Sequence, residues 1–217
     1  MHDLKIDSLV NKENPIDINY IPRDLVAVDD NKNNFHGYLD GKLKPFISLK
    51  AYPSFKKMEY ESIKDGIHIT VDSGYRSGEY QKRIFKKYYD EYLKIIMDEN
   101  PNIDETMAKR QAYELTVLRV AAPGCSEHQT GYAFDAASYR DGVYNAGTND
   151  TERAWLNENA YRYGFILRYP KGKEEITKFG FEPWHYRFVG KDISRELYNY
   201  GNWVTLEEFH EDNKKVR

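Results

Sequence analysis

Two short motifs contain side chains that can bind a divalent metal ion and transfer a proton. Residues 126–135 (SEHQTGYAFD) include His128 and Asp135, and residues 182–185 (EPWH) include a glutamate and a second histidine. Two imidazoles and one carboxylate are a typical ligand set of a catalytic zinc site, in which water takes the fourth position. A structural zinc site closes that position, usually with thiolates, and this chain has one cysteine. The motifs therefore predict a zinc enzyme.

The spacing within the first motif indicates how its side chains point. His128 and Asp135 are seven residues apart, so on one uninterrupted strand they would face opposite sides. Gly131 resolves this if His128 lies in a bend before the strand and Asp135 projects from within it. An aspartate in this otherwise apolar strand is hard to explain by packing, because a buried carboxylate without a partner is costly and a metal ion removes that cost.

The second motif separates its two functional side chains by Pro183, which keeps Glu182 extended. We expect His128, Asp135 and His185 to bind Zn²⁺. Glu182 then stays outside the coordination shell and accepts a proton from water. Either motif alone is equally compatible with a structural histidine or a hydrogen-bonded aspartate, and only the pair strongly favours a metal.

A third motif, residues 73–77 (SGYRS), places Arg76 just before a predicted helix. The free N–H groups and the dipole of a helix N-terminus favour an anion. Arg76 is therefore a candidate for stabilising an oxyanion or for binding a substrate carboxylate. Without the metal motifs, an ordinary helix cap with a surface arginine would be the better interpretation. We expect no role for Glu127 or Cys125, because residues adjacent to a ligand usually point elsewhere.

Composition sets the class of protein in which these motifs must work. The chain has 217 residues, of which 40% are hydrophobic and 31% charged, as in one globular domain. A net charge of -3 gives no general attraction to nucleic acid. No apolar run reaches the length of a membrane span, and residues 1–5 lack the apolar core of a secretory signal. We expect a cytoplasmic protein, or an exported or anchored one if a native leader is missing; whether it is a monomer or a homodimer stays open.

The expected elements are mixed helices and short strands, without a regular βαβ rhythm. This pattern predicts a single α+β domain with a small, mainly antiparallel sheet flanked by helices. An extended arm (1–24) is expected to precede a catalytic region (25–217), with a loop at 31–37. Predicted strands are 25–28, 67–71, 132–137, 166–169 and 184–189. Predicted helices begin at 53, after 77, near 104, at 151, 192 and 205, and the third of these is expected to bury Ala108, Ala112, Leu115 and Leu118.

Taken together, the motifs match a known family. The chain resembles the VanY-type D,D-carboxypeptidases, including the bifunctional VanXY D,D-dipeptidase/carboxypeptidases of glycopeptide-resistance clusters. The resemblance covers residues from about 10 to 190, and its most specific parts are SEHQTG followed by EPWH. It is carried by residues 10–12, 20–26, 73–77, Gln81, 123–131, Asp135 and 182–190.

The resemblance implies a zinc peptidase that removes the terminal D-Ala from a peptidoglycan precursor or stem peptide. It implies zinc ligation by the two histidines and the aspartate, a basic role for Glu182, and an oxyanion or substrate contact by Arg76. Gln81 and Ser126 are expected to hold the terminal carboxylate of the substrate. The implied fold is the small α+β domain shared with hedgehog-type signalling domains.

Two positions depart from the family pattern and leave subsite preference open. Ala122 stands where many exported relatives have arginine, and Tyr132 stands where a smaller aliphatic residue is common. An L,D-carboxypeptidase that trims tetrapeptide stems to tripeptides is therefore an alternative with the same zinc chemistry. A catalytically silent relative that binds cell-wall peptides is a further alternative, and Glu182 argues against it.

Overall fold

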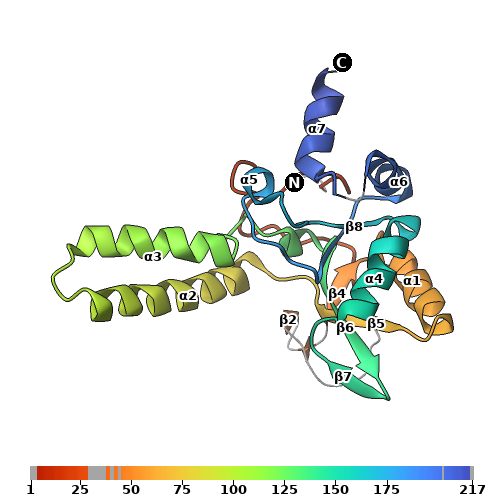
Figure 1. Cartoon of the computed structure of the whole chain (residues 1–217), viewed down its shortest axis with the longest axis horizontal. Coiled ribbons are helices and arrows are strands. Elements are labelled where there is room, and N and C mark those ends of the chain that lie inside the picture. Colours follow the sequence, from red (N-terminus) through yellow and green to blue (C-terminus); the bar gives the residue numbers. More distant parts are fainter. Residues whose placement is uncertain (1–3, 29–37, 40–41, 44, 202, 216–217) are drawn as a thin grey trace. The chain divides into compact units, whose positions relative to one another are not determined.

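The computed structural model describes residues 4–28, 38–39, 42–43, 45–201 and 203–215, and the chain divides into two compact units (Figure 1). The first unit consists of Met1–Leu9, Ile21–Arg76 and Glu127–Arg217, and the second of Val10–Tyr20 and Ser77–Ser126. Each unit is described by itself below. The expected loop at 31–37 lies outside the described residues, and the proposed division into an arm (1–24) and a catalytic region (25–217) stays a prediction.

The first unit is built on an antiparallel sheet in which β6 pairs with three other strands. The order is β5-β6-β9-β8, and β7 pairs with β6. The strands are β5 (His68–Ser73), β6 (Ala133–Arg140), β7 (Val143–Asn145), β8 (Phe165–Leu167) and β9 (His185–Phe188). Two small ladders join β1 (Leu25–Ala27) to β4 (Phe46–Ser48) and β2 (Tyr38–Leu39) to β3 (Lys42–Leu43).

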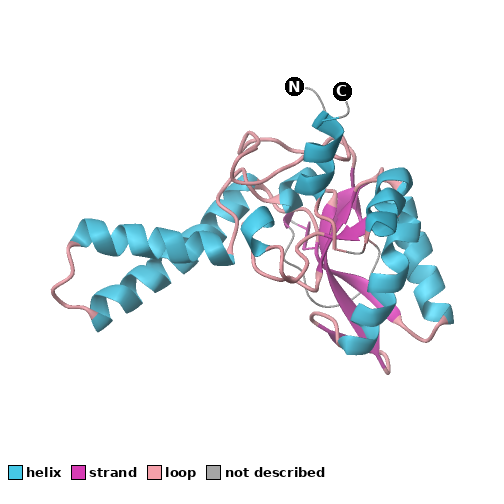
Figure 2. Ribbon diagram, turned by 45° about the horizontal axis from the view of Figure 1, so that its top comes forward, coloured by secondary structure: helices cyan, strands magenta, loops and turns pink. Residues whose placement is uncertain are grey.

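Helices flank this sheet (Figure 2). They are α1 (Tyr52–Lys64), α4 (Asp150–Asn159), α5 (Glu174–Thr177), α6 (Lys191–Tyr200) and α7 (Leu206–Lys215), with 3₁₀ turns η1 (Glu127–Thr130) and η2 (Ala160–Tyr163). The main core joins α1, α4 and η2 to the sheet through aromatic and aliphatic side chains. A smaller apolar cluster connects β8, α6 and the start of α7.

The second unit contains an antiparallel helical hairpin, α2 (Gly78–Glu99) and α3 (Glu105–Arg119). Ser77 caps α2 by accepting a hydrogen bond from the Tyr80 N–H, and Asp104 caps α3. Ile96, Ala108 and Ala112 form the buried seam.

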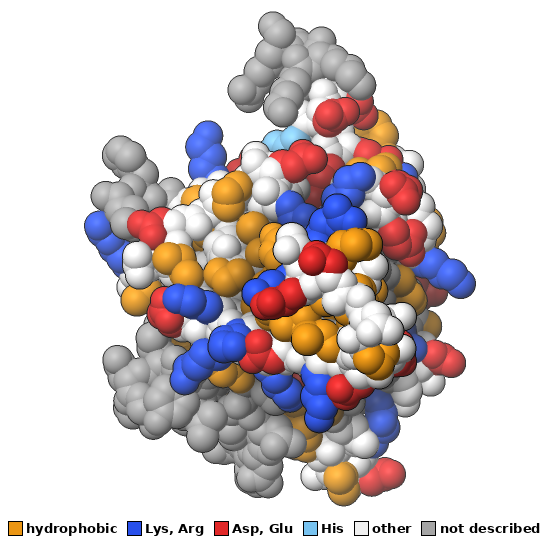
Figure 3. Space-filling model, turned by 90° about the vertical axis from the view of Figure 1, so that its left-hand side faces the viewer, with side chains coloured by type: hydrophobic (Ala, Val, Ile, Leu, Met, Phe, Trp, Pro, Cys, Tyr) orange, Lys and Arg blue, Asp and Glu red, His pale blue; other side chains and the backbone are white. Residues whose placement is uncertain are grey.

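One expectation for α3 is wrong: Leu115 and Leu118 are 41% and 63% exposed. The buried stripe instead continues in four-residue steps from Ala108 through Ala112 to Thr116. The Thr116 hydroxyl remains buried because it donates to the Ala112 carbonyl at 2.6 Å. On the face of the molecule in Figure 3, hydrophobic side chains are exposed among interspersed basic and acidic ones.

The expected α+β architecture, a small antiparallel sheet flanked by helices, is confirmed. The strands β4 and β7 and the short helix α5 were not expected. These elements are only three or four residues long, which is too short to show a periodic pattern in the sequence. Among the described residues, no helix is both long and apolar enough to cross a membrane.

The packing of α1 on the sheet gives a first prediction. The Phe55 side chain is fully buried, and its ring meets that of Phe134 edge to face, with centroids 5.3 Å apart. Phe55→Ala should lower the free energy of unfolding by about 3–5 kcal/mol, because it leaves a cavity in the core. Urea denaturation measures the change. Tyr60→Ala, on the exposed face of the same helix, should change it by less than about 0.5 kcal/mol; equal losses would contradict the packing.

A second prediction concerns Glu152, a buried carboxylate in the capping box that starts α4. Arg140 donates two hydrogen bonds to it, each of 2.7 Å. Burial alone would raise the pKa of Glu152, but the bonds from Arg140 and the Asn149 backbone lower it. Glu152→Gln should therefore cost about 1–3 kcal/mol of unfolding free energy at pH 7.

The sign of the pH dependence follows from this lowered pKa. A carboxyl group with a depressed folded-state pKa stabilises the fold above its unfolded pKa, about 4.3, and the contribution is lost as the pH falls below that value. The difference between wild type and Glu152→Gln should thus be full at pH 7 and shrink at pH 3. A difference that is independent of pH would mean that the variant acts through shape and not through charge.

Candidate metal centre

His128 reaches the centre because the chain turns sharply before β6. It lies in the 3₁₀ turn η1, and Gly131 follows with a φ of +72°. A Cβ atom on Gly131 would come within 2.9 Å of the Leu25 side chain and 3.3 Å of the Ser48 backbone nitrogen. The left-handed backbone and the close approach both require glycine here. The predicted bend between His128 and the strand is therefore present.

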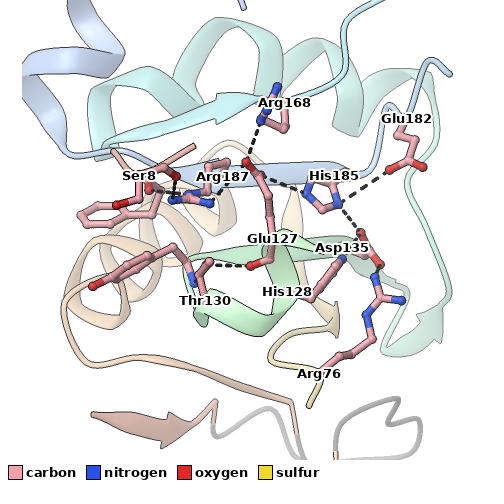
Figure 4. A network of polar contacts seen from close by, with 12 residues as sticks. Ser8, Arg76, Glu127, His128, Thr130, Asp135, Arg168, Glu182, His185 and Arg187 are labelled. Atoms are coloured by element: carbon pink, nitrogen blue, oxygen red, sulfur yellow. Dashed lines mark hydrogen bonds and ion pairs between the residues drawn. The ribbon is translucent and has the colours of Figure 1, made fainter. Parts of the chain in front are cut away.

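Strand pairing brings the second motif to the first. Asp135 of β6 and His185 of β9 are directly opposite each other in the antiparallel register. The Asp135 Oδ1 atom lies 3.2 Å from His185 Nδ1 and 3.3 Å from His128 Nε2. One ligand atom from each of these three residues lies within 4.8 Å of the others, a grouping that can hold a metal ion. Figure 4 shows the three side chains converging from η1, β6 and β9.

The ring nitrogens that face the centre are selected by their surroundings. His128 Nδ1 is 2.7 Å from the Gly74 carbonyl oxygen, to which it must donate. The other nitrogen, Nε2, then carries the lone pair and points toward Asp135. It is buried and has no hydrogen-bond partner among the described residues. A buried acceptor without a partner is costly, and a metal ion bound by this nitrogen removes that cost.

The charges of the centre suit a cation. Burial and then the charge of Arg76 lower the pKa of His128 to about 4, so this ring is neutral at pH 7. Despite burial, the two histidines hold the pKa of Asp135 well below its usual range. Burial would lower the pKa of His185, but Asp135 and Glu127 raise it to about 9. Three guanidinium groups also lie beside these carboxylates: Arg76 near Asp135, and Arg168 and Arg187 at Glu127.

Two further predicted residues lie beside the three candidate ligands. Glu182 Oε2 is 3.7 Å from His185 Nδ1, and burial raises the pKa of Glu182. A terminal nitrogen of the Arg76 guanidinium is 3.9 Å from Asp135 Oδ2. The backbone N–H of Arg76 donates to the His128 backbone carbonyl at 3.2 Å. A carboxyl group with a raised pKa and a guanidinium thus stand at the same centre, as base catalysis and oxyanion stabilisation require.

The remaining predicted residues, Gln81 and Ser126, belong to the second unit and are buried there. The Gln81 amide donates to the Ala121 carbonyl at 2.7 Å. Their expected contact with a substrate carboxylate stays a prediction.

No role was predicted for Glu127, but the structure places its carboxylate beside the His185 ring, on the side away from Asp135 (Figure 4). This carboxylate is 1% exposed, and Oε2 lies 3.6 Å from His185 Nε2. Arg168 and Arg187, both fully buried, are its charge partners. In the sequence, those two arginines stand among mainly apolar and aromatic residues. They could have indicated a buried carboxylate partner, because a buried guanidinium needs a buried acid.

The chain is similar to known proteins of one family. Residues 45–191 match the family model described as VanY: D-alanyl-D-alanine carboxypeptidase. The chain is 38% identical over 211 residues to the Bacillus subtilis (strain 168) protein YodJ, which covers 96% of this chain and 68% of YodJ.

Two solved structures are similar along nearly the whole chain. A vancomycin resistance D,D-pentapeptidase, VanY from a VanB-type resistance cassette, in complex with Zn(II), is 33% identical with a TM-score of 0.69, and the match covers 94% of this chain and 97% of that one. The LD-carboxypeptidase LdcB is 37% identical with a TM-score of 0.72, covering 95% of this chain and 86% of that one.

Proposed function

Since this chain belongs to the VanY family of D-alanyl-D-alanine carboxypeptidases, we propose that it is a zinc metallopeptidase that releases the terminal D-alanine of a peptidoglycan precursor or stem peptide. The observation that carries the proposal is the convergence of His128, Asp135 and His185, with Glu182 beside them. A binding module has no use for a carboxyl group of raised pKa next to an open metal site.

The three candidate ligands fit zinc in particular. Two imidazole nitrogens and one carboxylate oxygen are the ligand types of open, catalytic zinc sites, whereas Mg²⁺ and Ca²⁺ prefer oxygen alone. His128 Nε2 is buried and has no hydrogen-bond partner within the described part of the chain, which supports this assignment, and the similar VanY structure contains Zn(II). Bound at these residues, zinc would lower the pKa of a water molecule to about 7 and polarise the scissile carbonyl.

The protein's own residues then have distinct tasks. Glu182 accepts the proton of the attacking water and returns it to the amine of the leaving D-alanine, which balances the hydrolysis. Arg76 stabilises the negative charge that develops on the former carbonyl oxygen. Gln81 and Ser126 hold the terminal carboxylate of the substrate.

The L,D-carboxypeptidase activity is the second candidate, and the similarity to LdcB favours it. Tyr132, one of the two departures from the family pattern, does not help to choose between the D,D- and L,D-carboxypeptidase activities. Tyr132 is buried in the main core, and its hydroxyl lies 3.3 Å from both Lys50 Nζ and the Leu4 carbonyl oxygen. We infer that Tyr132 serves packing. The shape of the substrate groove then determines which of the two activities the protein has.

A panel of three substrates separates the candidates. D-Ala-D-Ala dipeptide, a pentapeptide precursor and a tetrapeptide precursor are incubated with zinc-loaded protein, and released alanine is measured. We expect release of D-Ala from the pentapeptide. Release only from the tetrapeptide would favour the L,D-carboxypeptidase, and dipeptide turnover would indicate the bifunctional branch. No release from any of them would support a silent peptide-binding relative.

A further inference from the structure

We propose that Glu127 is the positioning residue of His185: it holds the Nε2–H of this ring so that Nδ1 faces the metal. The inference rests on the proposed zinc site and adds a carboxylate outside the coordination shell. It also assigns a role to the buried charges of Glu127, Arg168 and Arg187, which do not take part in the proposed reaction.

The side chains of Glu127 and His185 face each other in the buried interior. Their facing atoms, Oε2 and Nε2, are 3.6 Å apart, which is longer than a hydrogen bond. Neither atom has a hydrogen-bond partner among the described residues, and both are buried. Since Nδ1 of the same ring faces Asp135 and Glu182, the two nitrogens have opposite tasks, and Nε2 is the one that must carry the proton.

Glu127 is itself fixed by two buried arginines. Arg168 Nε donates to Glu127 Oε1 at 2.8 Å, and an Arg187 terminal nitrogen lies 3.3 Å from the same oxygen. This arrangement occupies Oε1 and leaves Oε2 for the histidine. It also keeps the carboxylate charged in spite of complete burial, because two guanidinium groups compensate it.

The arginines are in turn held by the ends of the first unit. Arg168 donates two hydrogen bonds to Glu207 of α7, of 2.8 and 2.6 Å. Arg187 donates to the backbone carbonyls of Ile6 and Ser8, each at 3.0 Å. Two glutamates and two arginines thus balance in charge. Figure 4 shows Glu127, Arg168 and Arg187 of this network beside His185. Residues 6–8 and α7 both lie outside the segment matched by the family model.

A carboxylate on the outer nitrogen of a metal-binding histidine fixes the tautomer and raises the basicity of the ring, and its loss typically weakens metal binding about 10–100-fold. We therefore expect Glu127→Gln to raise the zinc dissociation constant by about that factor, measured by competition with a chromophoric chelator. This readout is independent of peptide hydrolysis. Unchanged zinc affinity in a folded variant would overturn the proposal.

A matched control removes another buried glutamate that is paired with an arginine. Glu152→Gln breaks the pair with Arg140, five residues beyond Asp135 on the same strand. It should cost stability but leave the zinc dissociation constant unchanged. An equal loss of zinc affinity in both variants would mean that Glu127 acts only through stability. If Glu127→Gln does not fold, Glu127→Asp keeps the charge and withdraws the carboxylate by one methylene, and it should also weaken zinc binding.

Nuclear magnetic resonance of ¹⁵N-labelled, zinc-loaded protein tests the geometry directly. The His185 ring should show a metal-bound Nδ1 and a protonated, exchange-protected Nε2, whose proton signal moves or disappears in Glu127→Gln. Metal binding through Nε2 would refute the assignment. Failure of wild-type protein to bind zinc at all would instead contradict the proposed function, so the two ideas fail in distinguishable ways.

Discussion

Glu182→Gln should leave zinc bound and lower turnover by about 10²–10⁴-fold, the usual contribution of a positioned general base. The amide keeps the size of the side chain but cannot accept the proton of the attacking water. Burial raises the pKa of Glu182, and its carboxylate lies 3.7 Å from His185 Nδ1, so it stands next to the centre without being one of the three grouped candidate ligands. Initial rates with the pentapeptide precursor and zinc content of the same sample give the measurement.

The expected change lies in kcat, because the base acts on the chemical step. Glu175→Gln is a suitable control, since it removes an exposed glutamate from the nearby helix α5 and should leave the rate unchanged. Peptide hydrolysis that survives Glu182→Gln at full rate would show that another group accepts the proton. Loss of zinc from this variant would show that Glu182 is a ligand.

Removal of the metal should abolish hydrolysis. A bound zinc ion supplies several kcal/mol of transition-state stabilisation, so a chelator should lower the rate by about 10²–10⁴-fold or more. Added Zn²⁺ should restore it. The rate and the metal content are measured together after chelation, after dialysis and after addition of zinc. Full activity in protein shown to be free of metal would refute a metallopeptidase.

A pair of histidine variants locates the metal. His128→Ala should reduce bound zinc from about one ion per chain to none, because it removes the buried Nε2 that faces Asp135. His68→Ala removes a half-buried histidine on β5, whose ring packs on Tyr139, and should leave the zinc content unchanged. Equal zinc content in both variants would place the ion elsewhere.

The buried network behind His185 suggests why the ends of the first unit matter for the centre. Glu127 is neutralised by arginines that α7 and residues 6–8 hold in place. Truncation at either end would leave a buried guanidinium without part of its hydrogen bonding, which is strongly unfavourable. Protein prepared for zinc-binding and kinetic measurements should therefore retain both segments.

The amino-acid sequence by itself determined the chemical inventory and the local structure. The ligand types in residues 126–135 and 182–185, the bend at Gly131, and the helices after Ser77 and Asp104 all follow from short-range properties: donor type, φ preference and capping. Such properties depend on neighbours within a few residues. Local reasoning failed at Leu115 and Leu118, because a helix periodicity alone does not say which of two apolar stripes meets a partner helix.

Only the tertiary structure decided how distant residues act on one another. The pairing of Asp135 with His185 depends on strand register. Which ring nitrogen of His128 and of His185 faces Asp135, and the contact of Glu127 with His185, depend on groups far away in the sequence. No role was predicted for Glu127 because its partners, Arg168 and Arg187, reach it only when β8, β9 and η1 come together. Desolvation makes this network obligatory: a charge removed from water must find its counter-charge in the same interior, and that interior exists only in the folded chain.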